Sequence, residues 1–245
     1  LEEDALKKGL KEVGLAEGRV LDSSILDKTE QELKRQYFSR GRYAVKIKTT
    51  VTPLERNRVA ILIEVSEGRV TKIHQVSIIG NKSFSDRELR KKFKLSTPTM
   101  FSFLTKNDQY SKQQLSADIE ALRSFYQNQG FLEFAINSTQ VSITPDKQHI
   151  YLTINLTEGQ KFTVSDVRLS GKLVVPEDEL RKLVSISAGD VFSRQAITES
   201  SKRISDRLGD DGYAFANVNA VPDIDRKKST VSFTFFVDAG QRAYV

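Results

Sequence analysis

The chain has 245 residues, of which 38% are hydrophobic and 29% are charged, a composition typical of a folded globular protein and not of a disordered one. It has no cysteine, which excludes disulfides, thiolate catalysis and zinc–thiolate sites. The net charge of +6 comes from 38 basic and 32 acidic residues interleaved along the chain, and no stretch approaches the roughly 18 apolar residues of a membrane-spanning helix.

The first 68 residues predict two helices followed by a β-hairpin. The first helix is expected near residues 1–6. The second carries one stripe with the spacing i, i+4, i+7, i+11, which places side chains on one face of an α-helix. The stripe residues are Leu26, Glu30, Leu33 and Tyr37. Alternating apolar residues at 43–51 and 59–65 then predict two strands, joined by a turn that contains Pro53.

Residues 69–159 repeat this order and place a further strand, expected at 70–79, in front of it. The stripe of the second helix is now Leu115, Ile119, Leu122 and Tyr126. The hairpin strands are expected at 134–144 and 150–156, with Pro145 in the turn between them. We expect the core of this repeat to contain Leu115, Ile119 and Leu122, packed against Leu152 and Ile154.

Residues 160–240 form a third copy with the same elements. Its first strand is expected at 162–170 and its hairpin strands at 215–221 and 231–237, with Pro222 in the turn. Its helix stripe is Ile197, Ser201, Ile204 and Leu208. Residues 241–245 look like the start of another copy. Because the chain begins at Leu1 without methionine or an apolar signal segment, we expect a fragment of a longer protein.

These patterns predict an α+β protein of three tandem β-α-α-β-β modules. The expected boundaries are 1–68, 69–159 and 160–240, followed by 241–245 as the start of a further module. Each module should pack a helix pair on a three-stranded mixed sheet, and the first module should lack its first strand. Because no Gly/Ser or Pro linker separates them, the modules are expected to touch and to form an elongated, curved, semi-rigid rod.

The sequence offers little for catalysis. His74 and His149 are interpreted as ordinary surface residues that sit in different modules, one in a strand and one beside a hairpin turn. No nucleophile-elbow, zincin, phosphate-loop or dinucleotide motif occurs. We therefore expect no enzyme activity, no cofactor, no metal and no small-molecule substrate. Despite a pI near 9.3, the aromatic residues lie in helix stripes and alternating strands, so nucleic-acid binding is not expected either.

A sheet edge is the first candidate for binding. If the second hairpin strand of a module is central in the sheet, the first becomes an exposed edge that can pair with an extended chain. In the second module this strand, residues 134–144, contains no Lys, Arg, Asp or Glu. The candidate residues are Ala135, Asn137, Thr139, Gln140, Val141 and Ile143. The alternative is that a neighbouring module or loop covers this edge.

A basic run on the first helix of the second module is the second candidate. Arg90, Lys91 and Lys94 could contact an anionic membrane surface or an acidic partner. The alternative is a solvated helix face without a partner.

A family resemblance rests on the residues that punctuate the repeats. Gly80-Asn81 ends a first strand, Gly130-Phe131 and Gly212-Tyr213 precede hairpins, and a Glu-Gly pair ends two modules. In this order the chain resembles tandem POTRA domains along essentially its whole length. Residues 110–115, 122–126 and 137–147 are similar to the barrel subunits of the Gram-negative outer-membrane assembly machine. Those subunits carry five such domains, and the three modules look like the second, third and fourth.

The resemblance implies a periplasmic location and a membrane barrel that follows in the same polypeptide. It also implies partners: unfolded outer-membrane proteins, which the modules would guide by strand addition at sheet edges, and periplasmic lipoproteins of the assembly complex. Two alternatives stay open. The chain could be the POTRA arm of a related transporter of the translocation or two-partner secretion type, or a stand-alone periplasmic scaffold for one folded partner.

Overall fold

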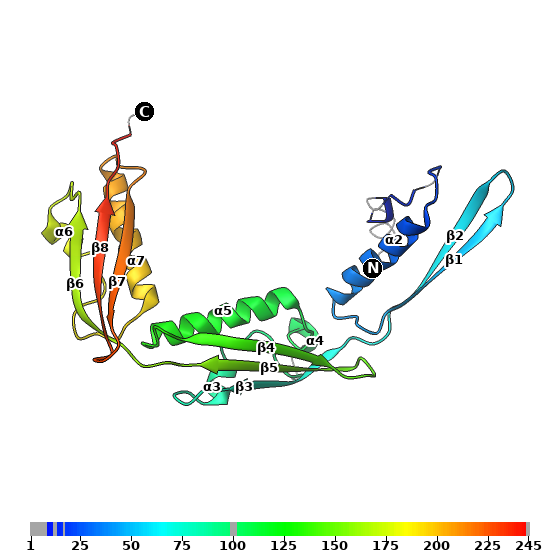
Figure 1. The fold of residues 1–245 in the computed structure, drawn as a ribbon, viewed down its shortest axis with the longest axis horizontal. Coiled ribbons are helices and arrows are strands. Elements are labelled where there is room, and N and C mark those ends of the chain that lie inside the picture. Colours follow the sequence, from blue (N-terminus) through cyan, green and yellow to red (C-terminus); the bar gives the residue numbers. More distant parts are fainter. Residues whose placement is uncertain (1–8, 12–13, 17, 99–101, 244–245) are drawn as a thin grey trace. The chain divides into compact units, whose positions relative to one another are not determined.

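The computed structural model describes residues 9–11, 14–16, 18–98 and 102–243. Along these residues a helix followed by a hairpin occurs three times, and the second and third copies begin with a further strand (Figure 1). The helix expected at residues 1–6 lies outside the described residues. Within the described part of the chain, no helix is both long enough and apolar enough to cross a membrane.

The first repeat contains one long helix and a two-stranded sheet. Its elements are α2 (Ser23–Phe38), β1 (Lys46–Leu54) and β2 (Arg58–Ser66). Helix α2 begins after Asp22, whose carboxylate accepts the N–H of Ser24 at 3.0 Å and so satisfies one of the free amides of the first turn. Strands β1 and β2 pair antiparallel.

The second repeat has a three-stranded sheet. Its elements are β3 (Lys72–Ile79), α3 (Asp86–Arg90), α4 (Ser102–Thr105), α5 (Lys112–Asn128), β4 (Ala135–Ile143) and β5 (His149–Thr157). The strand order is β3-β5-β4, so the second hairpin strand is central, as expected. Leu115, Leu122, Leu152 and Ile154 are buried, whereas Ile119 is half-buried. Four of the five residues that the sequence placed in this core are therefore buried.

The third repeat has the same topology. Its elements are β6 (Thr163–Gly171), α6 (Glu177–Arg181), α7 (Arg194–Asp210), β7 (Asn217–Asp225) and β8 (Thr230–Asp238). In the order β6-β8-β7, β6 runs parallel and β7 antiparallel to β8. Helix α7 lies along this sheet (Figure 1). The core between them includes Phe162, Leu180, Ile204, Leu208, Phe233 and Phe235. The predicted α+β fold of repeated helix-on-sheet modules with mixed sheets is therefore confirmed.

Two glycines end the first strands of the second and third repeats because no other residue fits there. Gly80 and Gly171 both have φ of +101°, in the left-handed region. A Cβ on Gly80 would lie 2.1 Å from the carbonyl oxygen of Leu156, and one on Gly171 would lie 2.3 Å from that of Val237. The central strand of each sheet approaches the preceding strand end so closely that a side chain is excluded.

Two prolines were expected in hairpin turns and instead lie within strands. Pro53 belongs to β1, opposite Val59, and Pro222 belongs to β7, opposite Phe233. A proline lacks the N–H of the sheet ladder, but on an edge strand that N–H can point away from the sheet, where no bond is lost. The hairpins are therefore longer than the sequence suggested, and Pro145 alone of the three lies in a turn.

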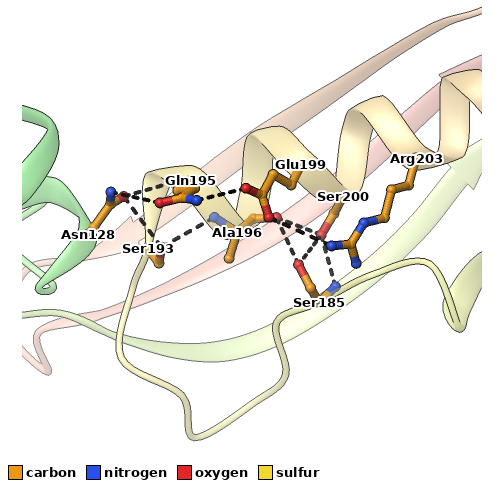
Figure 2. A network of polar contacts seen from close by, with 8 residues as sticks. All are labelled: Asn128, Ser185, Ser193, Gln195, Ala196, Glu199, Ser200 and Arg203. Carbon is orange, nitrogen blue, oxygen red and sulfur yellow. Dashed lines mark hydrogen bonds and ion pairs between the residues drawn. The ribbon is translucent and has the colours of Figure 1, made fainter.

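Hydrogen bonds from the end of α5 cap the start of α7 (Figure 2). The side-chain oxygen Oδ1 of Asn128 accepts the N–H of Gln195 at 2.9 Å. Beside it, Arg194 donates to the side-chain oxygen of Gln127 at 2.9 Å. The hydroxyl of Ser193 accepts the N–H of Ala196 at 3.2 Å. A residue of the second repeat thus completes a helix of the third.

Contacts between Cα atoms divide the chain into two compact units. One contains residues 1–77, 94–118 and 140–153, and the other contains residues 78–93, 119–139 and 154–245. The division falls within the second repeat, so the units do not coincide with the three modules. The module boundaries at 68 and 159 stay a prediction.

Candidate functional site

Strand β4 lies at the edge of the sheet of the second repeat. Its neighbour is the central strand β5, and its other side has no strand within the described residues. From Asn137 to Ser142 every residue is exposed, as is Ala135, while Ile143 is half-buried. All six residues proposed from the sequence therefore belong to one accessible strand. Side-chain hydrogen bonds tie this strand to β5, from Asn137 to Thr157 at 2.9 Å and from Asn155 to Ser138 at 2.8 Å.

Strands β1 and β7 are the structural equivalents of β4 in the other repeats, and both carry features that block pairing. Charged residues and proline on an edge strand prevent the addition of another strand. Strand β1 contains Lys46, Lys48 and Pro53, and β7 contains Pro222, Asp223 and Asp225. Strand β4 has neither a charge nor a proline in Ala135–Ile143. Among the three equivalent edge strands, β4 alone contains no charged residue and no proline.

The hairpin turn shows which backbone groups of β4 point away from the sheet. The N–H of Thr144 donates to the carbonyl oxygen of His149 at 3.0 Å, so this amide points toward β5. Along an antiparallel pair the inward and outward directions alternate from residue to residue. The N–H groups of Thr139, Val141 and Ile143 therefore point outward. These outward groups are the donors that an added strand would use.

The three basic residues of the second candidate are exposed. Arg90 ends α3, where its guanidinium donates to the carbonyl oxygen of Asp86 and lies 3.9 Å from its carboxylate. Lys91 follows as the C-cap residue of α3. The N–H of Lys94 is held by Asp118 at 2.9 Å. Within the described residues, neither Lys91 nor Lys94 forms an ion pair.

The interpretation of the two histidines as residues of different modules is wrong. His74 lies in β3 and His149 in β5, which are neighbours in one sheet, and the centres of the two rings are 5.2 Å apart. The ring of Tyr151 is also 5.2 Å from that of His74. Both residues also lie within the single expected module 69–159, and neighbouring strands of its sheet bring them together although they are far apart in sequence. In the described part of the chain, no three metal-binding side chains gather into a site, and the absence of metal binding stays a prediction.

Sequence reasoning missed a groove beside the start of α5. Its volume is about 550 Å³. It is lined by Arg35, Phe38, Ser39, Tyr43, Ser111, Lys112, Gln113 and Ser116. The ring of Phe38 stacks on that of Tyr43 with centres 5.2 Å apart. Burial raises the pKa of Tyr43 to about 12, and the neighbouring Tyr110 contributes to the rise, so this phenol is neutral.

The repeats match a known family at three places. The family model described as "Surface antigen variable number repeat", the POTRA domain, matches residues 2–68, 71–159 and 162–240. The chain belongs to the POTRA family. The resemblance recognised in the glycine punctuation is thereby confirmed, and the POTRA repeats account for nearly all of the chain.

Two curated relatives of this POTRA chain carry the same name. The outer membrane protein assembly factor BamA of Neisseria meningitidis serogroup B is 33% identical over 246 residues, which cover 100% of this chain and 31% of the relative. BamA of Buchnera aphidicola is 28% identical over 236 residues, covering 96% of this chain and 38% of the relative. The chain thus spans about a third of the length of these relatives.

A solved structure agrees with the sequence relationship. The crystal structure of Haemophilus influenzae BamA POTRA3-5 is 29% identical and superposes with a TM-score of 0.61, covering 70% of this chain and 67% of the other. Similarity in both sequence and fold connects these POTRA repeats with those of BamA.

Proposed function

We propose that this chain is the periplasmic arm of an outer-membrane protein assembly factor and that it binds extended polypeptides by strand addition at β4. The observation that carries the proposal is a difference between the equivalent edge strands. Strands β1 and β7 contain charged residues and proline, which hinder the addition of another strand, and β4 contains neither. A protein that left such an edge unguarded without using it would risk aggregation.

The clients we propose are unfolded outer-membrane proteins, which the arm would guide toward a membrane barrel, and lipoproteins of the assembly complex would dock on the same arm. The names of the relatives and the similarity of the POTRA repeats support this assignment. The chemistry also fits it, because backbone pairing accepts many sequences and so suits a series of different clients.

Binding at β4 should be weak and reversible. Four or five added backbone hydrogen bonds contribute roughly 0.5–1.5 kcal/mol each. Association costs about 4–15 kcal/mol in lost freedom of motion. The bonds sum to about 2–7.5 kcal/mol, which at best roughly offsets the association cost, so backbone pairing alone would hold a client only briefly.

Val141→Pro tests the proposal, because it removes an outward N–H and leaves the bonds to β5 in place. The strand should tolerate this proline, since the equivalent edge strand β7 contains Pro222. We expect at least tenfold weaker binding of a fluorescent peptide with the sequence of one outer-membrane barrel strand, measured by fluorescence polarisation. Val141→Ala, which keeps the N–H, should reduce affinity less than threefold.

Circular dichroism must show that both variants remain folded. A folded Val141→Pro variant that binds the peptide as tightly as the parent chain would rule out strand addition at this edge. Recognition would then have to move to the helix surface, where Arg90, Lys91 and Lys94 are the next residues to replace.

A further inference from the structure

The long helices of the three repeats differ in the group that accepts an N–H of their first turn. Ser24, Gln113 and Gln195 occupy one equivalent position, two residues before the first residue of each helix stripe. The amides of a first helical turn have no partner within the helix and need an acceptor from outside. The N–H of Ser24 has the carboxylate of Asp22, at 3.0 Å. The N–H of Gln195 has the side-chain oxygen of Asn128, at 2.9 Å.

The third amide, that of Gln113, has no hydrogen-bond acceptor among the described residues. The residue equivalent to Asn128 is Ser39, since each stands two positions before the glycine that follows its helix. Ser39 is too short to replace the asparagine, and its hydroxyl donates to the carbonyl oxygen of Gln36 at 2.8 Å instead. The groove of about 550 Å³ lies at this place and is lined by both Ser39 and Gln113.

The walls of the groove favour an anion with an apolar neighbour. Lys112 is exposed and, within the described part of the chain, forms no ion pair. Arg35 adds a second cation, although Glu32 pairs with it at 2.5 Å. The start of α5 contributes the positive end of its helix dipole. The stacked rings of Phe38, which is 38% exposed, and Tyr43 also line the groove.

We infer that the groove binds an acidic side chain of a partner polypeptide, whose carboxylate accepts the N–H of Gln113. An apolar residue next to it would pack on Phe38 and Tyr43. At both equivalent helix starts the acceptor is a protein side chain, and the volume is that of a pocket for a few side chains. This site is separate from β4 and does not depend on strand addition.

Nuclear magnetic resonance of the full 245-residue chain, labelled with ¹⁵N, tests the inference directly. The probe is the capped peptide acetyl-Gly-Leu-Glu-Leu-Gly-amide, and its control is the same peptide with glutamine in place of glutamate. A new charge-assisted hydrogen bond should move the Gln113 amide proton downfield in a saturable way. The amides of Ser24 and Gln195, which already have acceptors, should not move. The glutamine peptide should bind at least tenfold more weakly.

Ser39→Asn is the matched variant, because it places in the groove the residue that caps α7 at the equivalent position. We expect the introduced amide oxygen to accept the Gln113 N–H and to weaken binding of the glutamate peptide at least tenfold. Ser39→Ala, which leaves the amide open, should bind the glutamate peptide more tightly than Ser39→Asn does. The dispersed amide spectrum of each variant shows that it is folded.

Three results would overturn the inference. The first is equal affinity for the glutamate and glutamine peptides, and the second is unchanged binding to Ser39→Asn. The third is saturation of the Gln113 shift by acetate ion at the concentration at which the peptide saturates it, because the aromatic residues of the groove would then contribute nothing to the affinity. Val141→Pro should leave this binding intact, so that failure here and failure of strand addition are distinguishable.

Discussion

Glu158 connects the end of the second repeat to the start of its helix pair. Its carboxylate accepts the N–H groups of Lys82 and Ser83, the hydroxyl of Ser83 and the phenol of Tyr126, at distances of 2.7–3.1 Å. The residue is 7% exposed. In the sequence its Glu-Gly pair marks the end of a repeat, and in the structure Glu158 directly follows β5. The pair also provides the acceptor for a loop some 75 residues away.

The first repeat uses the same pair and the third does not. In the first repeat Tyr37 hydrogen-bonds to Glu67, and burial together with that carboxylate raises the pKa of the phenol. In the third repeat the equivalent residues are Leu208 and Ala239, both fully buried. Two buried polar residues can hydrogen-bond to each other, and two buried apolar residues need no hydrogen bond. A pair of one polar and one apolar residue would leave a buried polar group without a partner.

Replacing Glu158 should lower stability in a pH-dependent way. Burial alone raises the pKa of Glu158, but the N–H and hydroxyl donors outweigh it and hold the pKa below its ordinary value. A depressed pKa stabilises the fold above the unfolded value of about 4.3, and this stabilisation is lost as the pH falls toward the folded value. At pH 7, Glu158→Gln should reduce the free energy of unfolding by about 1–3 kcal/mol.

The difference from the parent chain should shrink between pH 5 and 3, measured by urea unfolding followed through amide signals of the second repeat. Glu133→Gln is the control, because Glu133 is partly exposed and pairs with Arg226 on the surface. A Glu158→Gln deficit that is constant from pH 7 to pH 3 would contradict the assigned role of the carboxylate.

At the scale of the element, each long helix carries a buried polar residue three positions after the first stripe residue. These residues are Thr29, Asp118 and Ser200, each at most 2% exposed. Asp118 accepts the N–H groups of Lys94 and Leu95 at 2.9 Å each. Ser200 accepts the N–H of Ser185 at 2.9 Å (Figure 2). In α5 and α7 this residue thus holds the segment that follows the first helix of the repeat.

The hydroxyl of Thr29 is the exception, because in the described residues it has no hydrogen-bond partner. The amides of Gly14 and Leu15, which precede α2 in the chain, donate to the carbonyl oxygens of Lys11 and Leu10. A buried hydroxyl without a partner costs free energy and contributes nothing in return.

Two substitutions at this shared position should therefore have opposite effects. Asp118→Ala leaves two backbone N–H groups without an acceptor and should lower the free energy of unfolding by about 2–4 kcal/mol. Thr29→Val removes an unpaired hydroxyl at nearly constant volume and should leave the stability unchanged or raise it by up to about 1 kcal/mol. Urea unfolding of each repeat measures both. Equal losses for the two variants would show that shape matters here and hydrogen bonding does not.

At the scale of the whole molecule, one backbone hydrogen bond recurs at the end of every repeat. The residue three positions after the glycine that ends the repeat donates its N–H to the carbonyl oxygen of the glycine that follows the long helix. The bonds are Thr71 to Gly41, Phe162 to Gly130 and Ala243 to Gly212, with lengths of 2.8–2.9 Å. The bond thus holds the residue directly before β3 and the residue directly before β6, and Ala243 is held in the same way.

Amide hydrogen exchange should show this bond at each position. Thr71 and Phe162 are fully buried, whereas Ala243 is exposed. Buried hydrogen-bonded amides exchange through larger openings than exposed ones, so we expect the first two to exchange at least about tenfold more slowly than Ala243. Exchange of Phe162 as fast as that of Ala243 would mean that this bond does not persist in solution.

Local patterns in the sequence were enough to predict the long helices α2, α5 and α7, the hairpins and their repetition. Helix stripes, strand alternation and glycine stops are set by residues a few positions apart, and each pattern occurs three times. The uncharged strand β4 could be read in the same way. The extent of β1 and β7 could not, because a proline at a strand edge is acceptable only when its missing N–H faces outward, and the pairing decides that.

Contacts between distant residues were decided by the tertiary structure alone. The approach of His74 to His149, the acceptors around Glu158 and the cap that Asn128 provides for α7 all join segments 30 or more residues apart. Within the described residues, the Gln113 amide stands out as unpaired only by comparison with the equivalent amides of Ser24 and Gln195, which both have acceptors. A hydrogen bond depends on the position of both partners, and the sequence specifies the partners without specifying which of them meet.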